Sequence, residues 1–581
     1  MISLAVTAIA AAFLIGLYAL YQFLLPKPIP GIPYNAKSAN RLLGDIPNLI
    51  SELSKGGDFV EWLADQHIKS NSAIRQIFLR PFGRPMILLA DYRECRELMV
   101  FRTKDFDRSQ DVSSMLRPVV RTNQFAQPTG SDWKLHRRLV QDTMSPAFLQ
   151  DVAAPSIYES CLRFIDLWNI KADLANGRPF AALDDFFYAT FDAVGAFTFG
   201  SAFPYSATKP QADGLAQLAS DDFVSDDIDK PIDFPQFDID ENITSMIRLV
   251  DGIERAQSSP SPALAWLMTK ASSSFRRARR IKDECIRREI EKAVASAKKN
   301  EASEDEAWVR NAVDHIIDRE NKLAERENRK PDYFSQIITD EIYGFILAGH
   351  DTTSTTMCWS SKLLAENPGW QGRLRKALHA AFPTAKTENR CPTAREIMET
   401  SIPYLDATIE ETLRYRPTAP LGTRDAIRDT TILGHPVPKG TTVIWLVNSS
   451  NFLKPAMEVD ESRRSQRCQE EKKQQSGRVG EWEDNDIGLF KPERWLTTDK
   501  EGSTVFDGNA GPSSPFGMGL RSCFGRRLAH VEMKIILAML FWSFELLECP
   551  AELSGHSGHL ALTYKPAQCY VRLKKVDHAN V

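Results

Sequence analysis

The chain has 581 residues, of which 43% are hydrophobic and 25% charged, a composition typical of a folded globular protein. It carries 72 Lys and Arg residues against 76 Asp and Glu residues, so it lacks the excess of positive charge that binding to a nucleic-acid backbone requires. The nine cysteines form no CxxC pair and no close group with histidine, which argues against a zinc site and a redox dithiol.

Residues 2–25 predict a transmembrane helix. They carry no charged side chain and would span about 36 Å as a helix, enough for a hydrocarbon core of about 30 Å. A cleaved signal peptide is the main alternative, but no basic segment precedes the apolar run and no small-residue cleavage site follows it. A buried core helix is the other. Lys27, Lys37 and Arg41 follow the run, so the positive-inside rule places the body of the chain in the cytosol.

Residues 26–34 contain four prolines and predict a stiff, extended linker, because proline cannot continue a helix. We expect residues 35–581 to form one large domain, mainly helical with small β-sheets. Residues 275–290 show helical periodicity with charged faces, whereas residues 85–90 and 441–447 read as strands.

Two segments depart from this background. Residues 220–241 are acidic and interrupted by two prolines, so they predict a loop, which could gate an entrance or simply lie in solvent. Residues 458–486 are dense in charge and glutamine and predict an exposed insertion loop without regular structure.

A long helical pattern over residues 340–364 contains the string Ala348-Gly-His-Asp-Thr-Thr353. Ala348 and Gly349 are small enough for a helix to pass close over a flat ligand. The Thr352 hydroxyl can bond to the carbonyl of Ala348 one turn earlier and bend the helix. A threonine-rich buried helix without chemistry is the alternative reading.

Residues 516–525 form a glycine-rich turn that runs into a helical pattern over residues 526–540 and places Cys523 at the start of that helix. The helix dipole and the free amides there are expected to lower the pKa of the thiol. The glycines let backbone approach a flat ligand. A buried structural cysteine is one alternative. A dinucleotide-binding loop is another, but the string lacks the third glycine and a clear preceding strand.

The spacing of Phe516, Gly519, Arg521, Cys523 and Gly525 resembles the haem-binding signature of cytochrome P-450 monooxygenases, most closely those of the fungal microsomal type. The resemblance extends over the anchor, the linker and nearly all of residues 60–575. It implies the cytochrome P-450 fold and haem b as cofactor, with Cys523 as the axial ligand of the iron. It also implies that the haem is contacted by Trp133, Arg137, Ala348, Gly349, Arg424, Phe516, Gly519, Arg521 and Gly525.

The resemblance also assigns roles to other residues. Asp351 and Thr352 match the positions that deliver protons for oxygen activation. Glu411, Arg414 and Arg494 match a structural network that supports the haem pocket. Arg137, Arg424 and Arg521 would hold the haem propionates, and their alternative reading is exposed surface arginine.

By this resemblance the chain activates dioxygen and hydroxylates, epoxidises or otherwise oxidises a hydrophobic small molecule, in secondary-metabolite biosynthesis by analogy. Only 56 residues follow Gly525, too few for a flavin domain, so electrons are expected from NADPH through a separate cytochrome P-450 reductase. The expected location is the endoplasmic reticulum membrane, crossed once, with a cytosolic catalytic domain. A docking surface for the acidic reductase is expected at Lys134, Arg137, Arg138, Arg526, Arg527 and Lys534.

Two other functions remain open. A haem-thiolate isomerase or dehydratase would use the same cysteine without a reductase, although the intact Asp351-Thr352 pair favours oxygen activation. A catalytically silent, membrane-anchored binding protein is the second. The segments expected to line the pocket are mostly apolar or small and do not name the substrate; they are residues 121–130, 345–348, 417–422 and 560–563.

Overall fold

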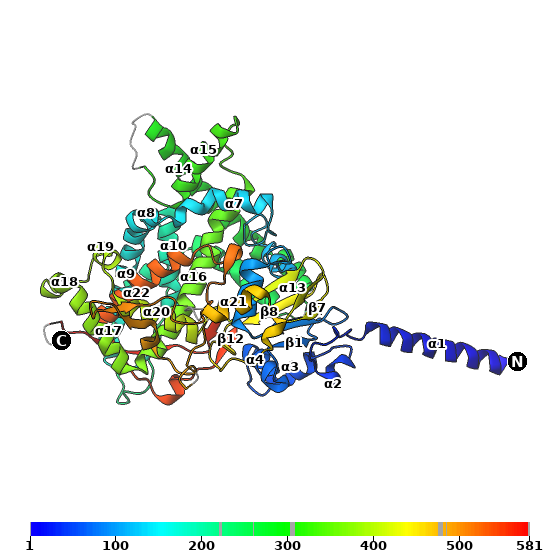
Figure 1. Cartoon of the computed structure of the whole chain (residues 1–581). Coiled ribbons are helices and arrows are strands. Elements are labelled where there is room, and N and C mark those ends of the chain that lie inside the picture. Colours follow the sequence, from blue (N-terminus) through cyan, green and yellow to red (C-terminus); the bar gives the residue numbers. More distant parts are fainter. Residues whose placement is uncertain are drawn as a thin grey trace. The chain divides into compact units, whose positions relative to one another are not determined.

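The computed structural model describes residues 2–219, 223–259, 261–301, 308–474, 480–483 and 485–578 (Figure 1). The chain divides into two compact units, each built from non-contiguous segments. Unit 1 comprises residues 1–109, 419–489 and 511–522. Unit 2 comprises residues 110–418, 490–510 and 523–581. The segment expected to be one domain, residues 35–581, thus contains parts of both units.

A five-stranded sheet organises unit 1, with strand order β1-β2-β8-β5-β3. The predicted strands at 85–90 and 441–447 are β2 (Met86–Leu89) and β8 (Thr442–Leu446), and they pair in parallel. Every residue of β1 (Ile74–Ile77), β2 and β8 is buried. The mostly apolar runs of β2 and β8 are typical of strands covered on both faces, whereas β1 buries the polar residues Arg75 and Gln76.

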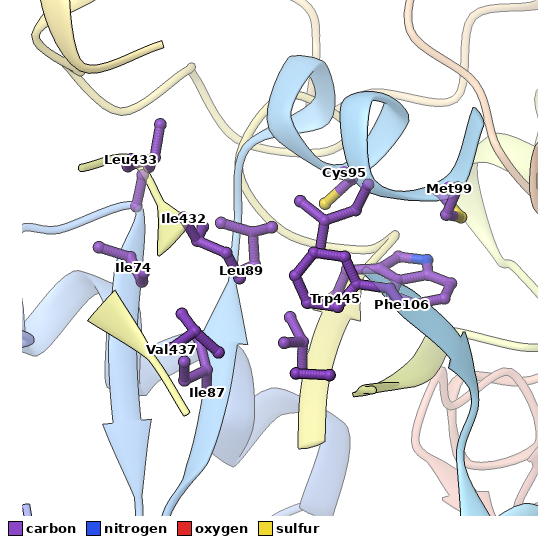
Figure 2. Packing of buried hydrophobic residues seen from close by; sticks show 14 of the residues in the cluster. Ile74, Ile87, Leu89, Cys95, Met99, Phe106, Ile432, Leu433, Val437 and Trp445 are labelled. Atoms are coloured by element: carbon purple, nitrogen blue, oxygen red, sulfur yellow. The ribbon is translucent and has the colours of Figure 1, made fainter. Parts of the chain in front are cut away.

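The core of unit 1 lies between this sheet and the helical segment that follows β2 (Figure 2). Cys95 and Met99 of that segment pack with Leu89 and Trp445 of the sheet. The expected linker also contributes to this core, because Ile29 and Ile32 are 5% and 2% exposed. The Gln76 side chain accepts from the Ile29 N–H at 2.8 Å and donates to the Ile29 carbonyl at 2.9 Å. Residues 26–34 are therefore fastened to the sheet by apolar contacts and hydrogen bonds.

The predicted insertion over residues 458–486 is partly structured, which corrects the expectation of an exposed loop. It contains the helix α21 (Gln466–Gln474), and residues 475–479 and 484 lie outside the described residues. Arg464 forms a bidentate ion pair with Asp91, with both bonds at 2.7 Å and both side chains buried. The charge pattern was misleading because some of its charges are partners of buried carboxylates.

The other elements of unit 1 are α1 (Ile2–Leu24), α2 (Ala36–Ala39), α3 (Ile46–Leu53), α4 (Phe59–Ser70), α5 (Tyr92–Arg96), β3 (Phe106–Arg108), β5 (Leu421–Ala426), β6 (Thr430–Ile432) and β7 (His435–Val437). Within α1, residues 6–24 have a mean hydropathy of 1.8 and are long and apolar enough to cross a membrane.

Unit 2 is a helical assembly around α16 (Gln336–Ala365), which contains the predicted helix 340–364. The Ser335 hydroxyl accepts from the amide of Ile338 and caps the start of α16. Helix α16 contacts α10 (Leu183–Phe199), α20 (Pro403–Tyr415) and α22 (Arg526–Ser543), as Figure 1 shows. Most of its residues are buried, so it forms the centre of unit 2.

The predicted helices 275–290 and 526–540 lie in α14 (Ser273–Glu301) and α22. The predicted loop 220–241 contains no α-helix over its described residues 223–240, although Ile232 forms an isolated bridge with Phe180, and α12 begins at Glu241. The first three residues of that loop, 220–222, lie outside the described residues.

The remaining helices of unit 2 are α6 (Gln110–Leu116), α7 (Ser131–Val140), α8 (Pro146–Phe148), α9 (Ala154–Ala175), α11 (Thr208–Leu215), α12 (Glu241–Gln257), α13 (Pro262–Ala271), α15 (Ala312–Arg326), α17 (Pro368–Ala381), α18 (Pro383–Thr387) and α19 (Ala394–Glu399). Its strands are β4 (Phe180–Ala181), β9 (Leu496–Thr498), β10 (Thr504–Phe506), β11 (Phe544–Leu547), β12 (Gly558–Leu560), β13 (Tyr564–Pro566) and β14 (Tyr570–Lys575), in three small sheets.

Candidate active site

Helix α16 has one open position in its otherwise buried middle turns. Thr352 is exposed and Ala348 is half-buried, whereas Asp351 and Thr353 are buried. The Thr352 hydroxyl donates to the carbonyl oxygen of Ala348 at 2.8 Å. The open face of α16 therefore carries a small residue and a hydroxyl whose proton is already engaged.

Gly349, expected to face a flat ligand, is required by helix packing. A Cβ at this position would lie 2.5 Å from Cγ2 of Val194 in α10, far inside van der Waals contact. The glycine thus lets α10 and α16 approach each other closely. Its half-buried backbone still borders the open face.

Cys523 lies just before α22, where the backbone amides of Gly525 and Arg526 favour the thiolate form of its side chain. The side chain is open to solvent although protein surrounds it on most sides. Burial raises the pKa of the Cys523 thiol, and the amides and the charges of Arg137 and Arg526 only partly oppose this effect. The expected fall in this pKa is therefore wrong for the protein alone, because desolvation outweighs the helix start. A cation bonded to the sulfur would supply the missing stabilisation of the thiolate.

Arg137 of α7 lies beside this cysteine. Its guanidinium is 4.2 Å from the centroid of the Phe524 ring and donates to the side-chain oxygen of Gln124 at 3.1 Å. Phe524 in turn stacks on Phe345 of α16, with ring centroids 6.4 Å apart. Trp133, one turn before Arg137, is buried. The cysteine, α7 and α16 are thus connected through one aromatic ring.

Glu411 is the centre of a buried network. It accepts from Arg414 at 2.8 Å in two bonds, from Arg494 at 3.1 Å and from the amide of Lys491 at 2.7 Å. The indole N–H of Trp495 adds a further bond at 2.9 Å. Glu411 and Arg414 have no exposed side-chain surface. This network joins α20 to the segment before β9, and sequence reasoning had not included Trp495 in it.

Unit 1 contains the predicted residues Arg424, Phe516, Gly519 and Arg521. Gly519 has φ +69°, and a Cβ there would lie 2.4 Å from the carbonyl oxygen of Met99. Only glycine fits this position. Gly519 thus fixes the turn Gly519–Arg521 against the Glu97–Phe101 segment.

Two arginines face each other across paired strands of unit 1. Arg424 of β5 is opposite Arg108 of β3. Burial lowers the pKa of both, that of Arg424 to about 10 with a contribution from the Arg108 charge. The Nε atom of Arg108 is buried without a hydrogen-bond partner. Two adjacent cations of this kind suit an anionic group, and nothing in the sequence pattern had singled out Arg108.

Asp351 does not share the exposure of its neighbour Thr352. Its carboxylate is 1% exposed and pairs with the Lys565 ammonium at 2.8 Å. It also accepts from the Thr563 hydroxyl at 2.8 Å. Sequence reasoning missed Lys565, which lies more than 200 residues further along the chain.

Comparison with known sequences decides the family. A sequence profile of the cytochrome P-450 family matches residues 71–451 and 487–569. The chain belongs to the cytochrome P-450 family. The profile skips residues 452–486, the region of the charged insertion.

Curated fungal relatives align along almost the whole chain of this cytochrome P-450. Cytochrome P-450 monooxygenase TRI13 of Fusarium sporotrichioides is 41% identical over 97% of this chain and 98% of its own. Cytochrome P-450 monooxygenase xilC of Penicillium rubens is 35% identical over 97% and 96%. The chain is therefore an oxidoreductase of the monooxygenase class.

The fold agrees with this assignment. The crystal structure of the cytochrome P-450DA heme domain matches with a TM-score of 0.65 at 18% identity, covering 96% of this chain and 99% of that one. The protein thus has the cytochrome P-450 fold, mainly helical with small sheets, as the sequence predicted.

The family implies haem, and the residues fit it. Cys523 offers an exposed sulfur beside two backbone amides that favour its thiolate form, as a thiolate ligand requires. A Cβ at Gly525, beside it, would meet no atom within 4 Å. The orphaned Nε of Arg108 and the neighbouring Arg424 suit a propionate. Within unit 2, Cys523 and Arg137 would hold the group.

Proposed function

We propose that this protein is a membrane-anchored haem-thiolate monooxygenase that oxidises a hydrophobic small molecule. The observation that carries the proposal is the exposed Cys523 side chain just before α22, where the backbone amides of Gly525 and Arg526 favour its thiolate form. The open face of α16, with Ala348 and Thr352, carries only small side chains.

Bound haem would supply the activation of dioxygen, with Cys523 donating electron density to the iron. The residues of the chain would supply protons and position the groups on the open face. Because the Thr352 hydroxyl donates to Ala348, its oxygen accepts a hydrogen bond from a water or substrate on the open face. Asp351 is the nearest acid in sequence, and its buried carboxylate reaches that face only by turning or through a water.

The electrons would come from NADPH through a separate reductase, and α1 would hold the enzyme at the same membrane, that of the endoplasmic reticulum. The reductase would dock at the expected basic surface of Lys134, Arg137, Arg138, Arg526, Arg527 and Lys534. Arg527 donates to the carbonyl of Met144 and Lys534 to that of Thr400. Lys134 and Arg138 of α7 are exposed and are its best candidates.

The substrate is proposed to be an apolar secondary metabolite. One fungal relative, 37% identical over 52% of this chain, bears the name of the Hps1-dma1 cluster of Dothistroma septosporum. Support for this part of the proposal comes from relatives alone.

Labelled dioxygen tests the reaction class. The full-length enzyme, reconstituted with a fungal reductase and NADPH, is incubated under ¹⁸O₂ with a panel of apolar natural products. A monooxygenase yields a product containing one ¹⁸O atom per turnover. An isomerase or dehydratase yields unlabelled product without NADPH, and that result would overturn the proposal.

A further inference from the structure

A buried ion pair fixes the acid of the α16 motif to a hairpin far along the chain. Strands β12 and β13 pair from Gly558 opposite Pro566 to Leu560 opposite Tyr564. Lys565 projects from this hairpin, and its ammonium lies 2.8 Å from Asp351 and 3.0 Å from Glu254 of α12. One cation therefore serves two carboxylates from two different helices.

The hairpin is held rigidly against α16. The Trp359 indole donates to the carbonyl of Tyr564 at 2.9 Å, and the two rings stack. The hydroxyls of Thr355 and Thr563 are 2.9 Å apart. Because Thr563 also donates to Asp351, Thr355 donates to Thr563. The hairpin backbone beside Lys565 is thus fixed, and the ion pair is a built feature of the fold.

Solvent exposure increases from Asp351 through Lys565 to Glu254. The side chain of Asp351 is 1% exposed, that of Lys565 18% and that of Glu254 25%. Burial disfavours the Lys565 ammonium, but Asp351 and Glu254 outweigh it and raise its pKa. The titratable groups near this ammonium include Asp351, His350 and Cys358 of α16, Glu254 and Asp251 of α12, and His559 of β12, which lies directly opposite Lys565 in the hairpin.

We propose that Lys565 is a positioning residue that holds the Asp351 carboxylate turned away from the open face of α16, and that Glu254 competes with Asp351 for the Lys565 ammonium. Because both carboxylates contact the same ammonium, a stronger contact between Lys565 and Glu254 would loosen the hold on Asp351 and let its side chain turn toward the open face. The inference rests on the proposed function only where it assigns Asp351 a role in catalysis.

Infrared spectroscopy of the purified full-length protein near neutral pH tests the first part without substrate or reductase. Lys565→Met removes the charge and keeps the apolar stem, leaving Asp351 buried without a cation, which favours its protonated form. We expect the spectrum of Lys565→Met minus wild type to gain one protonated-carboxyl band. The band should be absent from Lys565→Met/Asp351→Asn and from Lys565→Arg.

Lys574→Met is the matched control, because Lys574 forms an exposed ion pair with Glu545 at 3.1 Å in the neighbouring sheet. It should add no such band. If Lys565→Met gains no protonated carboxyl, or if its new band survives the Asp351→Asn change, the inference is wrong. Neither result depends on monooxygenase activity, so failure here is separate from failure of the proposed function.

The second part predicts opposite effects for the two carboxylates. Glu254→Gln should leave Asp351 ionised in the infrared spectrum. With reductase and NADPH but no added substrate, the release of hydrogen peroxide per NADPH should change several-fold in Lys565→Met, change less in Glu254→Gln, and stay unchanged in Lys574→Met. Equal effects of Glu254→Gln and Lys574→Met would overturn the role of Glu254.

Discussion

The indole N–H of Trp495 donates to Oε2 of Glu411 at 2.9 Å, in a position where neither side chain has measurable solvent exposure. The carboxylate receives its other bonds from Arg414, Arg494 and a backbone amide. Tryptophan at 495 is therefore part of the polar network around Glu411 as well as part of the core.

Replacing Trp495 with phenylalanine should destabilise the protein beyond the loss of ring size. A hydrogen bond to a buried charged group contributes about 1.5–3 kcal/mol, and its loss leaves Glu411 Oε2 with one donor fewer. Trp482→Phe is the matched control, because that indole donates to a neutral carbonyl, that of Pro512, at 2.9 Å. Thermal unfolding should show the larger loss for Trp495→Phe, and an equal loss in both variants would contradict a special role for the network.

Arg108 and Arg424 of unit 1 are predicted to strengthen haem binding. Arg108→Met and Arg424→Met should each speed transfer of haem to an apomyoglobin acceptor, because each removes a guanidinium that suits a propionate. Arg428→Met is the control, since Arg428 is 62% exposed and already pairs with Asp105. Equal transfer rates in all three variants would show that Arg108 and Arg424 have only a structural role.

The proposed docking surface predicts an effect on the rate of reduction by the reductase. Reversing the exposed charges with Lys134→Glu and Arg138→Glu should slow reduction by the reductase about tenfold at low salt, and less at high salt. Arg395→Glu, at an 83% exposed side chain on α19, serves as the control. Stopped-flow reduction with unchanged rates, at unchanged haem content, would remove α7 from the interface.

Glu532 of α22 predicts a pH dependence of stability. Burial raises its pKa to about 8, and the hydroxyl of Thr353, at 3.0 Å, opposes this only in part. Between about pH 4.3, where an unfolded glutamate titrates, and about pH 8, the folded protein holds a proton that the unfolded chain has lost. The contribution of Glu532 to stability is therefore complete at the acidic end and declines as the pH rises.

The Glu532→Gln variant should abolish that decline and become relatively more stable above about pH 8, by up to about 5 kcal/mol. Chemical unfolding across this pH range measures the slope in both proteins. Parallel slopes would show that Glu532 titrates alike in the folded and unfolded states.

Much of this fold was predictable because its signals are local. The long helices α14, α16 and α22 follow from periodicity within the segment, and the Thr352 bond to Ala348 spans one turn. The strands β2 and β8 follow from short apolar runs, but their parallel pairing across 350 residues does not.

The site was less predictable where its contacts join distant segments. Lys565 contacts Asp351, and Arg464 contacts Asp91, across hundreds of residues, and no local pattern in the sequence indicates either pairing. The sign of the Cys523 pKa shift was wrong for a related reason. The helix start is visible in the sequence, whereas the burial that outweighs it depends on the tertiary structure.

The carbon monoxide difference spectrum of the dithionite-reduced protein tests the central claim most directly, in wild type and in Cys523→Ala. The account predicts a Soret maximum strongly shifted to the red of that of histidine-ligated haem, present in wild type and lost in the variant. A wild-type protein that binds no haem, or that keeps the same spectrum without Cys523, would contradict it.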